Sequence, residues 1–180
     1  MHHALGQVEV SLDEMLIARD ERAARQTAAL ARFRAPLVSM TIVMPGPVKD
    51  GGLARHVMEV ALEQMDSLIS AHNWSLLSRE VFWQITGPEA IYVVDVEPRV
   101  LKSATIDLEE HHPIGRLWDL DIITTKGVGL SRFQLWRPAR PCLLCDRPAR
   151  ECSRSRRHSL PELMKQIRRM VDHFDRHPGS

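Results

Sequence analysis

Segments with helical apolar spacing alternate along the chain with short segments rich in β-branched residues. Apolar residues three and four positions apart predict helices over residues 12–33, 53–72, 98–110 and 158–174. Ser11 and Glu14 form a capping box, because each side chain can satisfy a backbone amide at the start of the first helix. The stripe expected to face the core, which Arg19 interrupts and Arg22 borders, consists of Leu12, Met15, Leu16, Ala23, Leu30 and Phe33.

Shorter segments are predicted to be strands. They cover residues 37–44, 73–85, 90–96, 118–122 and 130–136. From residue 37 the order is strand, helix, strand, strand, helix, strand, which is typical of a split βαβ arrangement. The sequence therefore predicts one α+β domain over residues 1–180, with helices on one face of a mostly antiparallel sheet. Residues 1–10 are expected to be a mobile lead, and a C-terminal Cys/His segment is followed by a helix.

An acidic pair follows a break in the chain near its middle. Pro113 and Gly115 interrupt the preceding helix, and apolar and charged residues alternate after them. In a strand, Asp119 and Asp121 share one face, and the apolar residues between and around them share the other. Two neighbouring carboxylates suit Mg²⁺, and Arg116 beside them suits a polyphosphate. The alternative interpretation is an amphipathic strand with a solvated acidic face.

Composition narrows the class of protein. With 180 residues, 44% of them apolar, and a formal charge of +1, the chain is expected to form a globular core. Eight arginines between residues 132 and 157 make the C-terminal third basic. No apolar run is long enough to span a bilayer, and no signal-peptide pattern is present. Three cysteines within eleven positions do not suggest a disulfide framework, so a reducing, cytoplasmic location is expected.

The three cysteines and one histidine have metal-ligand spacing. Cys142-x2-Cys145-x6-Cys152-x5-His158 can provide three thiolates and an imidazole for a closed tetrahedral zinc site. Nearby arginines favour the thiolate form. A CxxC redox pair or ordinary reduced cysteines are the alternatives, and a structural zinc is the preferred interpretation.

Several motifs resemble one enzyme family. The segments are 115–121 (GRLWDLD), 39–50 (SMTIVMPGPVKD), 18–26 (ARDERAARQ) and the cysteine segment 141–158. In this order they are similar to the citrate lyase holo-acyl-carrier-protein synthases, also called apo-citrate lyase phosphoribosyl-dephospho-CoA transferases. The resemblance covers nearly the whole chain.

The resemblance implies a specific reaction. A serine of the apo-acyl carrier (γ) subunit of citrate lyase would attack the α-phosphate of 2'-(5''-triphosphoribosyl)-3'-dephospho-CoA, and pyrophosphate would leave. Asp119 and Asp121 would hold Mg²⁺, and Arg116 would neutralise phosphate charge. The resemblance also assigns substrate-binding roles to Gly115, Arg19, Arg22, Lys49 and Asp50.

The wider nucleotidyltransferase pattern has a third carboxylate on a later strand, and no Asp or Glu lies between Ile122 and Cys145. The candidates for this role are Asp50, Asp95, Glu97, Glu109 and Glu110. Three other functions stay open from the sequence. They are the equivalent transferase of malonate decarboxylase, a zinc-knuckle nucleic-acid-binding module, and a non-catalytic adaptor that docks an acidic carrier. Under the preferred interpretation the partners are the carrier and the donor, with neither nucleic acid nor membrane.

Overall fold

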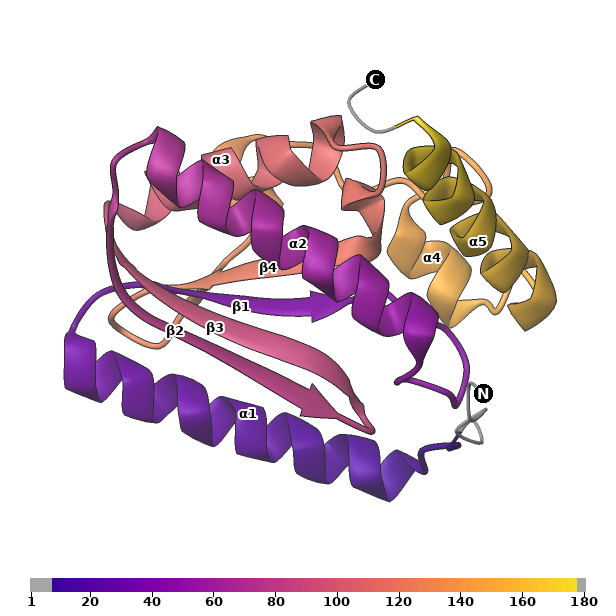
Figure 1. Cartoon of the computed structure of the whole chain (residues 1–180), viewed down its shortest axis with the longest axis horizontal. Helices are drawn as coiled ribbons and strands as arrows, with labels where there is room; N and C mark the ends of the chain where they lie inside the picture. Colours follow the sequence, from indigo (N-terminus) through magenta and orange to yellow (C-terminus); the bar gives the residue numbers. More distant parts are fainter. Residues whose placement is uncertain (1–7, 178–180) are drawn as a thin grey trace.

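A five-stranded antiparallel sheet, in the order β2-β3-β1-β4-β5, forms the centre of the computed structural model, which describes residues 8–177 (Figure 1). The strands are β1 Leu37–Ile42, β2 Ser75–Gln84, β3 Gly87–Asp95, β4 Trp118–Ile123 and β5 Gly129–Leu130. The helices are α1 Leu12–Phe33, α2 Gly52–Ala71, α3 Pro98–His111, α4 Ala149–Arg154 and α5 Leu160–Arg176, with 3-10 turns η1 Gly115–Leu117 and η2 Arg132–Leu135. The predicted α+β class and the split βαβ order from β1 to β4 are confirmed.

Helices cover both faces of this sheet, so the prediction that they lie on one face is wrong. α2 and α3 pack on the face that carries Val38, Met40 and Leu120, whereas α1 packs on the opposite face. The reason lies in β1 and β3, where consecutive residues are buried and neither face is left to water. A strand buried on both sides needs an apolar cover on each of them.

The apolar stripe predicted for α1 is confirmed only at the C-terminal end of the helix, whereas the capping box and the bounds of the helix are confirmed. Leu12 and Leu16 are 73% and 49% exposed, whereas Ala18 and Ala29 are buried, Ala29 in a cluster with residues of the sheet. Arg22 and Arg25 point towards the sheet because both pair with Glu89 of β3, which is buried. The pairing of a buried carboxylate therefore decides which side of α1 faces inwards. Leu30 and Phe33 pack against the buried core cluster as predicted, whereas Met15 is half-buried and Ala23 is exposed.

The predicted strand over 130–136 is mostly absent. Only Gly129–Leu130 pairs with β4, and a second capping box, between Ser131 and Gln134, starts the 3-10 turn η2 instead. Phe133 and Trp136 project from this turn and are 79% and 88% exposed.

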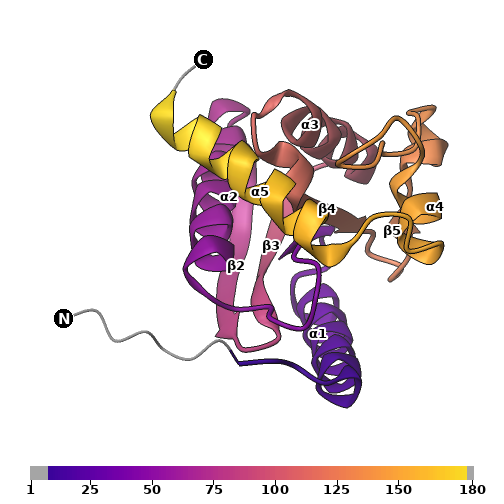
Figure 2. The ribbon, with the colours of Figure 1, turned by 90° about the vertical axis from the view of Figure 1, so that its right-hand side faces the viewer.

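The C-terminal elements α4 and α5 lie beside the end of the sheet at which β1 finishes (Figures 1 and 2). α5 packs on the main core through Ile167 and Val171. Most of the predicted mobile lead, residues 1–7, lies outside the described residues, and Val10 at its end is buried and bonded to Pro47. Within residues 8–177 no helix is long and apolar enough to cross a membrane.

Candidate active site

The acidic pair lies on the α1 face of the sheet, at the start of β4. The alternation predicted from the sequence is confirmed, because Trp118 and Leu120 are buried while Asp119 is half-exposed and Asp121 exposed. Across the strand pair, Asp119 is opposite Thr41 of β1. Burial and the Asp121 carboxylate raise the pKa of Asp119, and the nearby Arg140 acts to lower it.

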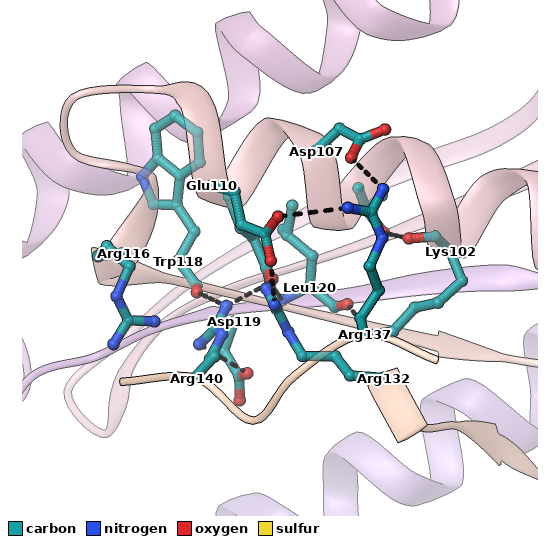
Figure 3. A network of polar contacts seen from close by, with 12 residues as sticks. Lys102, Asp107, Glu110, Arg116, Trp118, Asp119, Leu120, Arg132, Arg137 and Arg140 are labelled. Atoms are coloured by element: carbon teal, nitrogen blue, oxygen red, sulfur yellow. Dashed lines mark hydrogen bonds and ion pairs between the residues drawn. The ribbon is translucent and has the colours of Figure 1, made fainter. Parts of the chain in front are cut away.

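The outer edge of β4 is closed by side chains rather than by a neighbouring strand. β5 pairs only with the last two residues of β4, so the backbone groups before them need other partners. Glu109 accepts from the Leu120 amide at 2.9 Å, and Lys102 donates to the Leu120 carbonyl at 3.0 Å. Arg140 donates to the Trp118 carbonyl at 2.5 Å (Figure 3). These bonds fix the position of the strand that carries the acidic pair.

Glu109 is the centre of this polar network. Its carboxylate is buried and accepts from Arg132 at 2.6 Å and from Arg140. Arg140 also reaches Asp119, with 3.5 Å between Nη1 and Oδ1, and Arg132 reaches Glu110 at 2.5 Å. Among the candidates for a third carboxylate, Glu109 therefore lies next to the acidic pair. Its carboxylate oxygens, however, already accept from two arginines and from the Leu120 amide.

A small pocket of about 190 Å³ opens on the α1 face close to the acidic pair. Thr41, the cross-strand partner of Asp119, forms part of its wall together with Arg22 and Lys49. Lys49 donates to the Met44 carbonyl at 2.6 Å, and burial lowers its pKa. The fold thus brings two of the sequence-predicted cations, from segments far apart in the chain, to one pocket.

Two other sequence-predicted residues lie away from this pocket. Arg19 is exposed on α1 and does not line it. Asp50 accepts from both Nε and Nη2 of Arg55, at 2.9 and 2.7 Å, and from the Gly51 amide. These hydrogen bonds, the one from Arg55 first among them, hold the pKa of Asp50 below its usual value. Asp50 is therefore already paired within its own turn.

Gly115 and Arg116 have roles that the sequence did not reveal. Gly115 is buried so closely under α3 that a Cβ would lie 2.6 Å from the Glu109 carbonyl oxygen. Arg116 donates to the Pro141 carbonyl and lines a second, larger cavity. Burial, together with the charge of Arg140, lowers the pKa of its guanidinium. Contact of either residue with substrate stays a prediction.

The larger cavity measures about 700 Å³ and lies where β1 ends. One wall is the segment from Val43 to Gly46, and another is formed by Arg116 and Arg140. The C-terminal segment closes it with Cys142, Leu143, Ala149, Cys152, Ser153, Arg156, His158, Ser159, Leu160 and Leu163. Arg140 therefore contacts both the acidic pair and this cavity. Sequence reasoning missed Arg140, because no local pattern relates a loop residue to a strand 21 positions earlier.

The three cysteines and His158 converge as their spacing predicts. One ligand atom from each lies within 4.8 Å of the others, and Cys145 Sγ is 3.5 Å from Cys152 Sγ and 3.4 Å from His158 Nε2. Burial raises the pKa of the Cys152 thiol to about 11, and so do the hydrogen bonds that this thiol donates to Cys145 and Cys142. Burial acts to raise the pKa of Cys142, but hydrogen bonds from the Leu144 amide and from Cys152 outweigh it and lower that pKa. This group can hold a metal ion.

Comparison with known proteins gives one consistent result. The family model described as apo-citrate lyase phosphoribosyl-dephospho-CoA transferase matches residues 10–174. A protein of that name from Citrobacter koseri is 41% identical over 166 residues, which cover 92% of this chain and 91% of the relative. A second, from Escherichia coli O7:K1 (strain IAI39), is 39% identical over 174 residues, covering 97% and 92% of the two chains.

Proposed function

The chain belongs to the apo-citrate lyase phosphoribosyl-dephospho-CoA transferase family, and from that premise we propose that it attaches the phosphoribosyl-dephospho-CoA group to the acyl carrier subunit of citrate lyase. The donor is 2'-(5''-triphosphoribosyl)-3'-dephospho-CoA. A serine hydroxyl of the apo-carrier attacks the donor's α-phosphate and loses its proton, and the bond from the α- to the β-phosphate breaks. The products are a phosphodiester on the carrier and pyrophosphate.

The observation that carries this proposal is the position of the acidic pair beside a pocket that holds two cations, Arg22 and Lys49, and one carboxylate, Glu89, which pairs with Arg22. Asp119 and Asp121 share one face of β4, and Arg22 and Lys49 line the pocket next to the Thr41–Asp119 pair. Phosphoryl transfer needs positive charge around the leaving phosphates and a base near the nucleophile. Arg22 and Lys49 neutralise the β- and γ-phosphates, and one of the two carboxylates accepts the serine proton.

The two aspartates also fit Mg²⁺, because hard cations prefer carboxylate oxygens and substrate phosphates. Asp119 and Asp121 would hold it, and when bound it supplies charge neutralisation at the triphosphate. A bound cation would offset the repulsion between the two carboxylates, which adds to the effect of burial in raising the pKa of Asp119.

Zinc is the metal that best fits the Cys/His group, since three thiolates and one imidazole complete a closed tetrahedral site. Its role would be structural, because the four residues would fill all four positions and leave none for substrate. This proposal includes a cytoplasmic location, because zinc binding needs the three cysteines in their reduced form.

The carrier of malonate decarboxylase is the alternative acceptor. The relatives' names contain citrate lyase, which favours the citrate lyase carrier. A transfer assay with both purified apo-carriers decides between them. A carrier that gains the mass of the prosthetic group is a substrate.

The proposal is tested by removing each carboxylate charge. Asp119→Asn and Asp121→Asn should each lower transfer at saturating donor by about a hundredfold or more, because loss of a group that stabilises the transition state costs several kcal/mol. Carrier mass gives the rate, and thermal unfolding checks that both variants fold. Asp172→Asn, which changes an exposed aspartate on α5 that lines neither pocket, is the matched control. Near-native transfer in either site variant would show that the acidic pair is not the reaction centre.

A further inference from the structure

The larger cavity has the size and lining of a ligand site. The reaction proposed above, however, places only the triphosphate of the donor, in the smaller pocket. The smaller pocket, at about 190 Å³, has room for little more than phosphate groups. The larger one, at about 700 Å³, lies in the range of about 300–1,000 Å³ that is usual for whole ligands. The donor has a part of matching size, which is the dephospho-CoA that the phosphoribosyl group carries.

We propose that the larger cavity binds the dephospho-CoA portion of the donor. This inference rests on the proposed function and adds the location of the donor's largest part. It also assigns Arg156 and Leu163, which lie in the C-terminal segment, to donor binding.

The charges of the cavity suit the diphosphate of dephospho-CoA. Three arginines line it, namely Arg116, Arg140 and Arg156, and no Asp or Glu is among the lining residues. Arg116 is held in place by the Pro141 carbonyl, and Arg140 by the Trp118 carbonyl and by ion pairs with Glu109 and Asp119. Their guanidinium groups are therefore positioned before a ligand arrives, which reduces the entropy lost on binding. Planar arginine forks match phosphate oxygens.

The apolar lining suits the pantetheine arm. Val43, Leu143 and Leu163 contribute aliphatic surface, and Leu160 closes the wall at the start of α5. Gly46 belongs to this wall too, because a Cβ at that position would lie 2.8 Å from the Leu160 side chain. The turn after β1 thus packs directly against the start of α5. An amide-containing aliphatic chain needs such a surface, since burying its methylene groups drives binding.

The cavity is connected to the reaction centre through two residues. Arg140 lines the cavity and lies 3.5 Å from Asp119. Met44, which follows β1, lines both the larger cavity and the smaller pocket, so the two spaces are adjacent at this residue. A donor with dephospho-CoA in the cavity can therefore present its triphosphate to Asp119 and Lys49.

The test uses dephospho-CoA itself as the probe, which lacks the triphosphate and cannot react. Titration calorimetry on the full chain should show one site per chain. Arg156→Gln should weaken binding about tenfold, because it removes a charge from the cavity wall. Arg157→Gln is the matched control, since the neighbouring arginine is exposed and does not line the cavity. It should stay within about twofold of the wild type. Leu163→Asp should also weaken binding, whereas Leu12→Asp, at an exposed position on α1, should not.

The outcomes separate this inference from the proposed function. Equal effects of Arg156→Gln and Arg157→Gln, or no binding of dephospho-CoA to a wild-type protein that transfers the group, would overturn the cavity assignment alone. Binding that depends on Arg156, in a protein that modifies no carrier, would instead overturn the proposed reaction. Asp119→Asn provides a further check, because it should lose transfer and still bind dephospho-CoA with wild-type affinity.

Discussion

Arg140 and Asp119 are joined across the edge of the sheet, with 3.5 Å between Nη1 of the arginine and Oδ1 of the aspartate. The same guanidinium donates to the Trp118 carbonyl and to buried Glu109. One side chain thus fixes the start of β4, balances part of the charge of the acidic pair, and forms a wall of the larger cavity. A planar group with several donors is needed to make these contacts together.

The first prediction concerns that combination of contacts. Arg140→Lys keeps the charge but cannot reach three acceptors at once, so turnover should fall about tenfold or more while the KM for carrier changes little. Arg132→Lys is the matched control, because Arg132 also pairs with Glu109 but makes no contact with Asp119 in the described structure. Steady-state kinetics and urea unfolding of both variants are the measurements. If the two lose stability and turnover in parallel, Arg140 serves the fold alone.

Local patterns in the sequence predicted the features that depend on nearby residues. The two faces of β4 follow from alternation, and the Cys/His cluster follows from ligand spacing. The prediction of a strand over 130–136 was wrong because it relied on the apolar residues of this segment and overlooked a helix-start signal. Ser131 and Gln134 form a capping box that starts a helical turn, and this signal was present in the sequence.

Other features depend on residues that are distant in the chain, and no local pattern predicts them. The orientation of α1 is determined by Glu89, whose two arginine partners lie 64 and 67 positions earlier. The contact between Arg140 and Asp119 likewise joins a loop to a strand. A buried charge acquires its partner from the tertiary fold, so only the structure identifies the pair.

The second prediction is a pH dependence that comes from Lys49. Burial lowers the pKa of this lysine, so its positive charge is lost at a lower pH than usual as the pH rises. The KM for donor should therefore increase on the alkaline side. Lys49→Arg should move that increase to higher pH, because arginine stays protonated. Lys126→Arg, in the exposed turn after β4, should leave the profile unchanged. An identical profile for wild type and Lys49→Arg would exclude Lys49 as the titrating group.

The third prediction tests the packing role of Gly115. Gly115→Ala would place a Cβ 2.6 Å from the Glu109 carbonyl oxygen and 2.8 Å from that of Leu108, so backbone must move. Overpacking of this kind costs about 1–3 kcal/mol of unfolding free energy. Gly52→Ala is the control, since a Cβ there meets nothing within 4 Å. Urea unfolding compares the two. A stable Gly115→Ala variant that loses only donor affinity would instead support the substrate contact expected from the sequence.

The fourth prediction concerns the metal. Protein purified without chelator should contain about one zinc per chain, and His158→Gln should lower that content and expose the C-terminal segment to protease. All three cysteines of the chain belong to the cluster, so a histidine provides the control. His111→Gln changes an exposed ring on α3 and should keep the metal. Metal-free protein with an unchanged protease pattern would indicate that the cysteines only pack together.

The last prediction separates the basic residues that meet the carrier from those that meet the donor. Arg150, Arg154 and Arg157 are exposed and lie outside the cavity, whereas Arg156 lines it. An acidic carrier is attracted by exposed charge over long range, and salt screens that attraction over about 8 Å at physiological ionic strength. Changing the three exterior arginines to glutamate should raise the KM for carrier about tenfold and flatten its dependence on salt.

The same change should leave kcat and the KM for donor nearly constant, because a donor bound by desolvated arginine forks is little affected by salt. Kinetics at two ionic strengths, with one substrate varied at a time, give both constants. Lys126→Glu, in the exposed turn after β4, controls for a charge reversal made outside the basic segment. Should the exterior reversals raise the KM for donor and not that for carrier, the whole basic segment belongs to the donor site, and the carrier docks on another face.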